Sequence, residues 1–123
     1  MQLLNIVLAL VPLVAVSEAA CHQSGESWGS MKDSVLYQLR DACRASVLSG
    51  SYGQGQKKTH CIFVPGSGKH ADLEVKRLTG GSTSLSEYDC YYYLNREITG
   101  CDKGGRRAYD NWEFSADPNA GAC

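Results

Sequence analysis

The sequence predicts a single α+β domain in which helices pack on a small antiparallel sheet and disulfides stabilise the whole. Two segments carry apolar residues at helical spacing, and between them lie one segment rich in β-branched and aromatic residues and one in which apolar and polar residues alternate. Six cysteines in a chain of 123 residues are the third indication, because small secreted domains commonly supplement a modest core with disulfides.

The beginning of the chain has the composition of a secretory signal peptide. An almost wholly apolar stretch of h-region length precedes the small residues that signal peptidase requires, namely Ser17, Ala19 and Ala20. Cleavage after Ala19 fits better than cleavage after Ala20, because the latter places Glu18 at a recognised position. We therefore expect a signal peptide over residues 1–20 and a secreted, extracellular, cysteine-rich domain over residues 21–123.

All the cysteines lie beyond this leader, which predicts three disulfides. The sequence does not determine their pairing, although Cys101 and Cys123 bracket one turn-rich tail and are a candidate pair. Each bridge typically contributes about 2–4 kcal/mol to stability. The cysteines are Cys21, Cys43, Cys61, Cys90, Cys101 and Cys123.

Charge and residue spacing exclude several classes of partner. The chain has 12 Lys and Arg against 13 Asp and Glu, so no excess of positive charge favours nucleic acid or an anionic membrane surface. No second apolar stretch is long enough to span a membrane. The sequence has no CxxC pair and its histidines are widely separated, so neither a metal nor a cofactor is expected.

Residues 31–47 are predicted to form an amphipathic helix. Ser30 is placed to cap its start and Gly50 to stop it. The apolar stripe consists of Met31, Val35, Leu39, Ala42, Cys43 and Val47.

A β-hairpin is predicted next, with strands over residues 60–64 and 70–78 joined by a turn at residues 65–68. The last strand is expected over residues 112–116. The Asp-Pro-Asn sequence at residues 117–119 is a turn signal that ends it.

A second helix lies between the hairpin and the last strand. Residues 84–87 have capping-box spacing, and Gly100 ends the helix. Its buried stripe is predicted to contain Cys90, Tyr91, Leu94 and Ile98.

Three parts of the sequence carry a resemblance to a known family. Gly-Glu-Ser-Trp-Gly at residues 25–29, the segment 97–105 and the C-terminal segment 116–123 resemble small secreted proteins of filamentous fungi, in particular the glycan-binding proteins of ink-cap mushrooms. The resemblance implies an α/β/α-sandwich domain that binds fucosylated or N-acetylgalactosamine-containing glycans. It also implies homodimerisation through sheet edges, and it makes a glycan or glycoprotein the expected partner.

A segment after the second helix combines the residue types that sugar sites use. Sugars stack their C–H faces on aromatic rings, and their hydroxyls bond to Asn, Asp or Arg side chains. The predicted glycan-binding residues are Arg106, Tyr109, Asp110, Asn111 and Trp112. The alternative is a disulfide-held loop in which Trp112 fills the core and the charged groups are solvated.

Three consecutive tyrosines lie on the second helix. Tyr91 joins the buried stripe, whereas Tyr92 and Tyr93 turn outward beside Asp89 and Arg96. We add Tyr92 to the predicted sugar site. Two alternatives are an oligomer contact and rings that lean over the helix with their hydroxyls in water.

A small secreted ribonuclease is the enzymatic alternative. His60, His70, Glu74 and Arg77 supply an acid, a base and a phosphate-binding group. Strand alternation, however, places His70 and Glu74 on one face and Arg77 on the other. We therefore assign no catalytic residue.

The leading hypothesis is a secreted, lectin-like protein that recognises cell-surface glycans and is not an enzyme. A fungal effector or toxin-like protein acting on a host target is the non-enzymatic alternative. That alternative would be favoured if Tyr92 and Tyr93 formed an exposed apolar patch and the protein bound no sugar.

Overall fold

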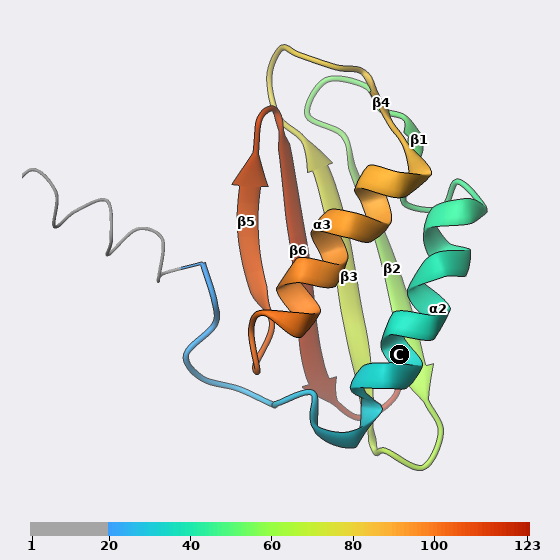
Figure 1. Cartoon of the computed structure of the whole chain (residues 1–123), viewed down its shortest axis with the longest axis vertical. Coiled ribbons are helices and arrows are strands. Elements are labelled where there is room, and N and C mark those ends of the chain that lie inside the picture. The colour runs from blue at the N-terminus through green and yellow to red at the C-terminus, as the bar shows by residue number, and fades with distance from the viewer. Residues whose placement is uncertain (1–19) are drawn as a thin grey trace, which may run out of the picture.

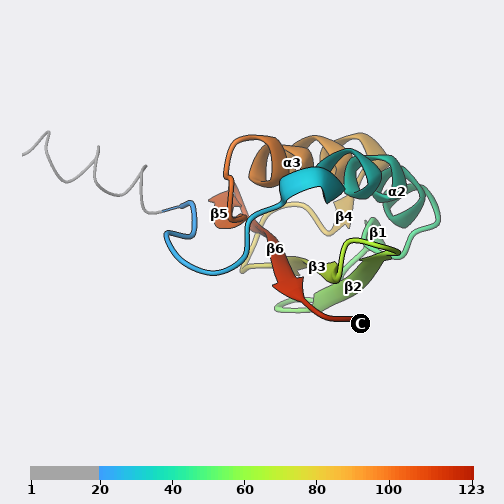
Figure 2. The ribbon, with the colours of Figure 1, turned by 90° about the horizontal axis from the view of Figure 1, so that it is seen from below.

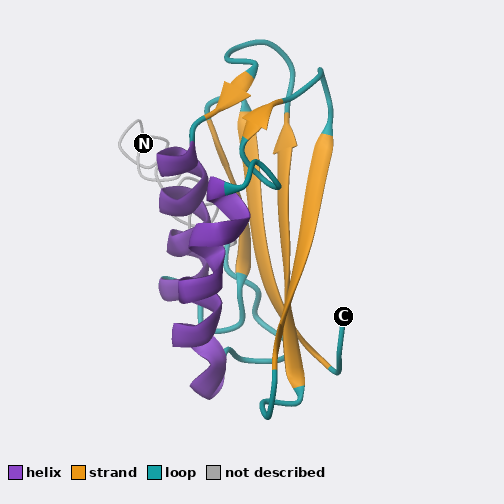
Figure 3. Ribbon diagram, turned by 90° about the vertical axis from the view of Figure 1, so that its right-hand side faces the viewer, coloured by secondary structure: helices purple, strands orange, loops and turns teal. Residues whose placement is uncertain are grey.

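Two helices lie side by side on one face of a four-stranded antiparallel sheet in residues 20–123, the part of the chain that the computed structural model describes (Figures 1 and 3). This confirms the predicted α+β class. Residues 1–19, which carry nearly all of the expected signal peptide, lie outside the described residues. No helix in the described part covers the second face of the sheet, so the three-layer α/β/α arrangement is not present there.

The first helix, α2, spans Lys32–Arg44 and follows a short 3-10 turn, η1, at Gly29–Met31. Its start has no side-chain cap, so the capping role predicted for Ser30 is wrong. The helix also ends earlier than predicted, because the chain enters the left-handed region at Ser46 with φ 61°, and Val47 lies outside the helix. The buried positions of α2 are Val35, Leu39, Ala42 and Cys43.

The second helix, α3, spans Glu87–Thr99. Its cap is Ser86, whose hydroxyl accepts a hydrogen bond from the Asp89 amide at 3.0 Å. Ser84 does not cap the helix, because it belongs to the two-residue strand β4 (Ser84–Leu85), which pairs with β1 (Gly50–Ser51). Three residues of the predicted stripe are buried and Tyr91 packs against them; the buried ones are Cys90, Leu94 and Ile98.

The four-stranded sheet has the order β2-β3-β6-β5, and every neighbouring pair is antiparallel. The predicted hairpin is confirmed as β2 and β3, while β5 was not predicted. The strands are β2 (Lys57–Val64), β3 (Lys69–Arg77), β5 (Gly105–Tyr109) and β6 (Trp112–Ala120).

The turn predicted at residues 117–119 is wrong, because β6 continues through it. Ala116 is the last β6 residue paired with β5, opposite Gly105. Pro118 lies two residues further along, where no strand of the described part pairs with β6 on the β5 side. Its missing amide hydrogen therefore breaks no ladder bond, and the strand tolerates the proline.

The sheet has one face against the helices and one face open to solvent (Figure 2). Strand alternation sends apolar side chains to the helix face, including Ile62, Val64, Ala71, Leu73, Val75, Phe114 and Ala116. The open face carries polar side chains, including Thr59, Asp72, Glu74, Arg106, Glu113, Ser115, Asp117 and Asn119.

Three disulfides close the fold, as predicted, and they hold its layers and edges together. Cys43–Cys90 joins the two helices, Cys21–Cys101 joins the N-terminal segment to the end of α3, and Cys61–Cys123 joins β2 to the C-terminal tail. The candidate pair Cys101–Cys123 is wrong. Three disulfides in so small a domain are typical of extracellular proteins. Within residues 20–123, neither helix has the length and hydropathy to cross a membrane.

Candidate functional site

The structure distributes the residues of the predicted sugar site over several places. Arg106 lies on the open face of the sheet, and Asp110 and Asn111 form the turn between β5 and β6. The Asn111 side-chain amide donates to two carbonyl oxygens of the loop before β4, so it holds that loop in place. Trp112 is only 6% exposed and contacts Tyr52 edge to face, so it fills the core. Its ring face is not open to a ligand.

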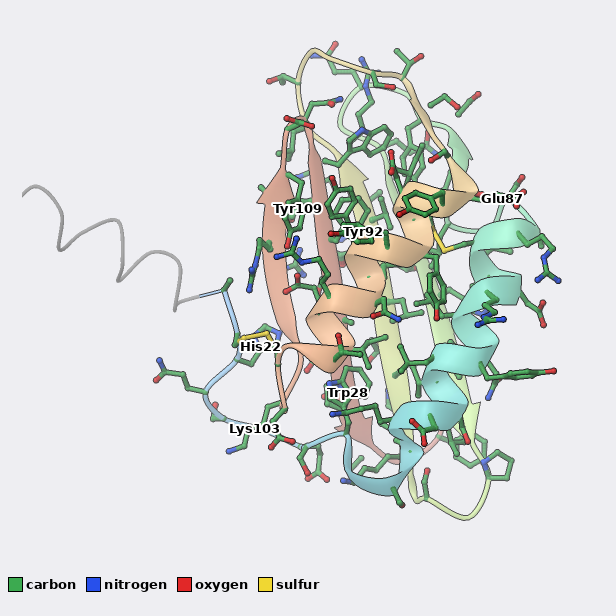
Figure 4. All side chains as sticks on the ribbon, in the orientation of Figure 1. His22, Trp28, Glu87, Tyr92, Lys103 and Tyr109 are labelled. Carbon is green, nitrogen blue, oxygen red and sulfur yellow. A yellow bond between two sulfur atoms is a disulfide. The ribbon has the colours of Figure 1, made fainter. Side chains whose placement is uncertain are left out.

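Two predicted residues do come together around Arg96. Tyr93 lies between them, with ring centres 5.1 Å from Tyr92 and 4.3 Å from Tyr109. The Arg96 guanidinium lies 5.9 Å from the Tyr92 ring centre and 5.5 Å from that of Tyr109. Figure 4 shows Tyr92 and Tyr109 on neighbouring elements, α3 and β5.

Tyr109 forms a hydrogen bond with a buried carboxyl group. Its hydroxyl lies 3.5 Å from an oxygen of Glu97, which is fully buried and also 3.7 Å from Arg107. The other Glu97 oxygen, Oε1, has no hydrogen-bond partner among residues 20–123. Burial raises the pKa of Glu97, although Arg107 opposes the shift, and burial also raises the pKa of Tyr109.

Replacing Glu97 with glutamine is expected to stabilise the protein progressively more as the pH rises. The pKa of Glu97 is raised above its ordinary value of 4.5, so the stability it contributes is present below that pH and is lost as the pH rises through the raised pKa. Glutamine does not titrate, so urea unfolding of both proteins between about pH 4 and pH 8 should give diverging curves. Glu87→Gln, at the exposed start of the same helix, is the control. Parallel curves for Glu97→Gln would contradict the expectation.

The outer surface of the helix layer contains a groove lined by two tyrosines, which we call the tyrosine groove. It has a volume of about 250 Å³. Tyr37 is 74% exposed, and the Arg40 guanidinium lies 5.8 Å from the centre of the half-buried Tyr91 ring. The residues that line the groove are Asp33, Leu36, Tyr37, Arg40 and Tyr91.

Helical spacing and one disulfide position these side chains. Asp33 and Tyr37 are four residues apart on α2, as are Leu36 and Arg40, so each pair lies on one side of the helix. Cys43–Cys90 fixes the end of α2 against the start of α3 and so brings Tyr91 opposite them. Tyr37 was not predicted from the sequence as a site residue. The signal for it was a large aromatic residue outside the apolar stripe of an amphipathic helix.

A second, larger cleft of about 390 Å³ lies on the open face of the sheet. Arg106 is held there between two carboxylates, at 2.6 Å from Glu74 and 2.8 Å from Glu113. The hydrogen bond that Arg106 donates to Glu74 is the main cause that raises the pKa of Arg106. We call this the sheet-face cleft. Its polar lining includes Thr59, Asp72, Glu74, Arg106, Ser115 and Asp117.

The residues of the ribonuclease alternative are brought together only in part, because His60 and Glu74 line the sheet-face cleft and the other two do not. His70 and Glu74 share a face of β3, but they are four residues apart, which is about 13 Å along a strand. His60 contributes to a pocket beside α2, and Arg77 donates to the Tyr52 carbonyl oxygen on the helix side. Only His60 and Glu74 of this set line a shared cleft, and strand alternation directs their side chains to opposite faces of the sheet.

One cluster on the open face has the residue types of a metal site but not its chemistry. Ligand atoms of Cys61, His70 and Asp72 lie within 4.8 Å of one another. The Cys61 sulfur, however, is bonded to Cys123, and His70 is bound to the Gly121 carbonyl oxygen and to Asp72. The hydrogen bond to Gly121 is the main cause that raises the pKa of His70. This cluster is a structural link to the C-terminal tail.

No protein-family model matches the sequence, and no curated protein shows significant similarity to it. The likeness to the glycan-binding proteins of ink-cap mushrooms therefore stays a prediction, and functional inference rests on the geometry above.

Proposed function

We propose that this protein binds carbohydrate and holds a sugar ring in the tyrosine groove. The observation that carries the proposal is a groove with two tyrosine rings in its walls and a carboxylate and a guanidinium in its lining. Tyr37 and Tyr91 offer faces for the C–H groups of a sugar, while Asp33 accepts and Arg40 donates hydrogen bonds to hydroxyls. Because the two charges are opposite, the groove favours a neutral sugar over an anionic one.

The dimensions of the groove suit a small ligand. Its volume of about 250 Å³ lies below the range of about 300–1,000 Å³ that is usual for drug-sized ligands. A single sugar ring at the end of a glycan fits this size, with the rest of the glycan in solvent. The terminal fucose and N-acetylgalactosamine that the resemblance implies are the first neutral sugars to test.

The sheet-face cleft is a weaker candidate for the same function. No tyrosine, tryptophan or phenylalanine is among the residues that line it, so it lacks the rings on which sugars usually stack. Arg106 is already neutralised by Glu74 and Glu113, and a ligand would have to compete with both carboxylates. Of the glycan-binding residues predicted from the sequence, Arg106 alone lies in this cleft.

Replacing Tyr37 with alanine is expected to lower the affinity for the bound glycan by about tenfold or more, because an exposed stacking face is lost. Tyr88→Ala is the matched control, since Tyr88 is 73% exposed, lies on α3 and does not line the groove. The secreted, disulfide-bonded protein is first applied to a glycan array, and calorimetry with the selected glycan then compares the variants.

Three outcomes decide the proposal. A loss confined to Tyr37→Ala supports the tyrosine groove. Equal affinities for wild type and Tyr37→Ala would move the sugar site elsewhere. Silence of the folded protein across the array would overturn carbohydrate binding and favour the effector hypothesis, in which the exposed tyrosines of α3 contact a host protein.

A further inference from the structure

The sheet leaves one edge without a partner strand in the described residues. β2 pairs with β3 alone, at the end of the strand order. The opposite edge, β5, is partly covered by the N-terminal segment, where the Arg106 amide donates to the Ala20 carbonyl oxygen and the His22 amide donates to that of Gly104. An edge strand with free amide and carbonyl groups is a template for pairing with another chain.

The register of the hairpin shows which backbone groups of β2 face this free side. The Arg77 amide donates to the Gln56 carbonyl oxygen at 2.9 Å. Antiparallel pairs alternate between bonded and non-bonded positions, so even-numbered β2 residues bond to β3. The amides and carbonyls that point outward belong to Lys57, Thr59, Cys61 and Phe63, of which all but Cys61 are exposed.

A pocket of about 260 Å³ lies between α2 and β2, and we call it the β2 pocket. When a strand is added to the β2 edge, every second side chain of that strand faces the helix layer. A pocket on that side therefore selects which side chains the added strand can carry. The C-terminus lies on the opposite side of the sheet from the helices, so it leaves the pocket free (Figure 2). The pocket is lined by Gln38, Asp41, Ala42, Val47 and His60.

The chemistry of the β2 pocket suits a long basic side chain. Ala42 and Val47 supply an apolar surface for an aliphatic stem, and Asp41 supplies a carboxylate for its charged end. The ion partner of Asp41 is Arg44 at 3.3 Å, and both side chains are largely exposed, so this pair is weak and readily exchanged.

We propose that the free edge of β2 binds an extended segment of a partner protein as an added strand, with a lysine or arginine of that segment in the β2 pocket. A second copy of this chain does not supply that side chain. Lys58 is the one lysine or arginine that β2 directs to the helix side, and its ammonium is bound to the Ser49 carbonyl oxygen at 2.9 Å and lies 4.2 Å from the Tyr52 ring centre.

The test uses two blocked peptides of alternating threonine and valine that differ at the central position, which is lysine in one and glutamate in the other. Titrations of the disulfide-bonded protein are followed by amide NMR. The lysine peptide is expected to shift the amides of Thr59, Cys61 and Phe63, to slow their hydrogen exchange, and to bind about tenfold more tightly than the glutamate peptide. Asp41→Lys should remove or reverse this preference. The matched charge change Asp102→Lys, in an exposed loop, should keep it.

A backbone variant separates strand addition from simple charge attraction. Thr59→Pro removes one outward amide, and an edge strand tolerates proline at such a position. It should abolish binding of the lysine peptide while the amide spectrum stays folded. Equal binding of the two peptides, shifts away from β2, or no binding by either peptide would overturn the proposal. Dimerisation of the protein through β2 would also overturn it, because the occupant would then be a second copy.

Discussion

Replacing both Cys43 and Cys90 with alanine is expected to lower the free energy of unfolding by about 4 kcal/mol, the value for a loop of this length. The bond closes a segment of 47 residues and joins the two helices. Both cysteines are buried among the core residues of α2 and α3. Urea unfolding of the double variant and the wild type measures the change.

The same variant also tests how the tyrosine groove is held. Without the bond, Tyr91 on α3 is no longer fixed opposite Tyr37 on α2, so glycan affinity should fall even at temperatures where the variant is folded. The double variant Cys21→Ala and Cys101→Ala is the control, because it opens a segment of 80 residues at the far end of α3. It should lose similar stability and keep its glycan affinity. Equal glycan affinities for the two folded variants would show that the disulfide does not position the groove.

Replacing Trp28 with alanine is expected to lower the free energy of unfolding by about 3–5 kcal/mol. Trp28 is fully buried beneath the start of α2, and its indole Nε1 donates to the Cys101 carbonyl oxygen at 2.9 Å. The variant therefore loses both a large buried ring and a partner for a buried carbonyl group. The measurement is again urea unfolding, with near-ultraviolet circular dichroism to confirm the native packing.

Trp28→Phe separates the two contributions, because it keeps an aromatic ring and removes the hydrogen bond. We expect it to cost less than Trp28→Ala, by an amount that reflects the retained ring. If the phenylalanine and alanine variants were equally unstable, the hydrogen bond to Cys101 rather than the volume of the ring would determine the stability of this region. A loss below about 1 kcal/mol for alanine would contradict the structural role of Trp28.

Local sequence patterns predicted those helices and strands that bury apolar residues at a regular spacing on one face. The spacing of Val35, Leu39 and Ala42 predicted α2, and the alternation of Ala71, Leu73 and Val75 predicted β3, because burial on one face imposes these periods. The sequence did not determine where each helix and strand begins and ends. Ser84 and Ser86 both suit a helix cap, and only pairing of Ser84 with β1 leaves Ser86 as the cap.

Tertiary contacts decided the parts that have no such local signal. The segment that forms β5 has few strand-forming residues, and it becomes a strand because β6 lies beside it and Asp110, with φ 53°, permits the tight turn between them. Cysteine pairing depends on which chain segments meet in space, so the spacing of Cys101 and Cys123 was a poor guide.

The candidate site shows the same division. The sequence indicated that Tyr92 faces outward beside a charged group, since this follows from the position of a residue around one helix. The same prediction for Tyr93 is wrong, because its ring stacks on Phe114 and packs against the core. The sequence did not show that Tyr37 and Tyr91 form one groove or that β2 is a free edge, and it left open whether Trp112 fills the core or binds a sugar. Each of these depends on contacts between residues far apart in the chain, and such contacts arise only when the helices pack on the sheet.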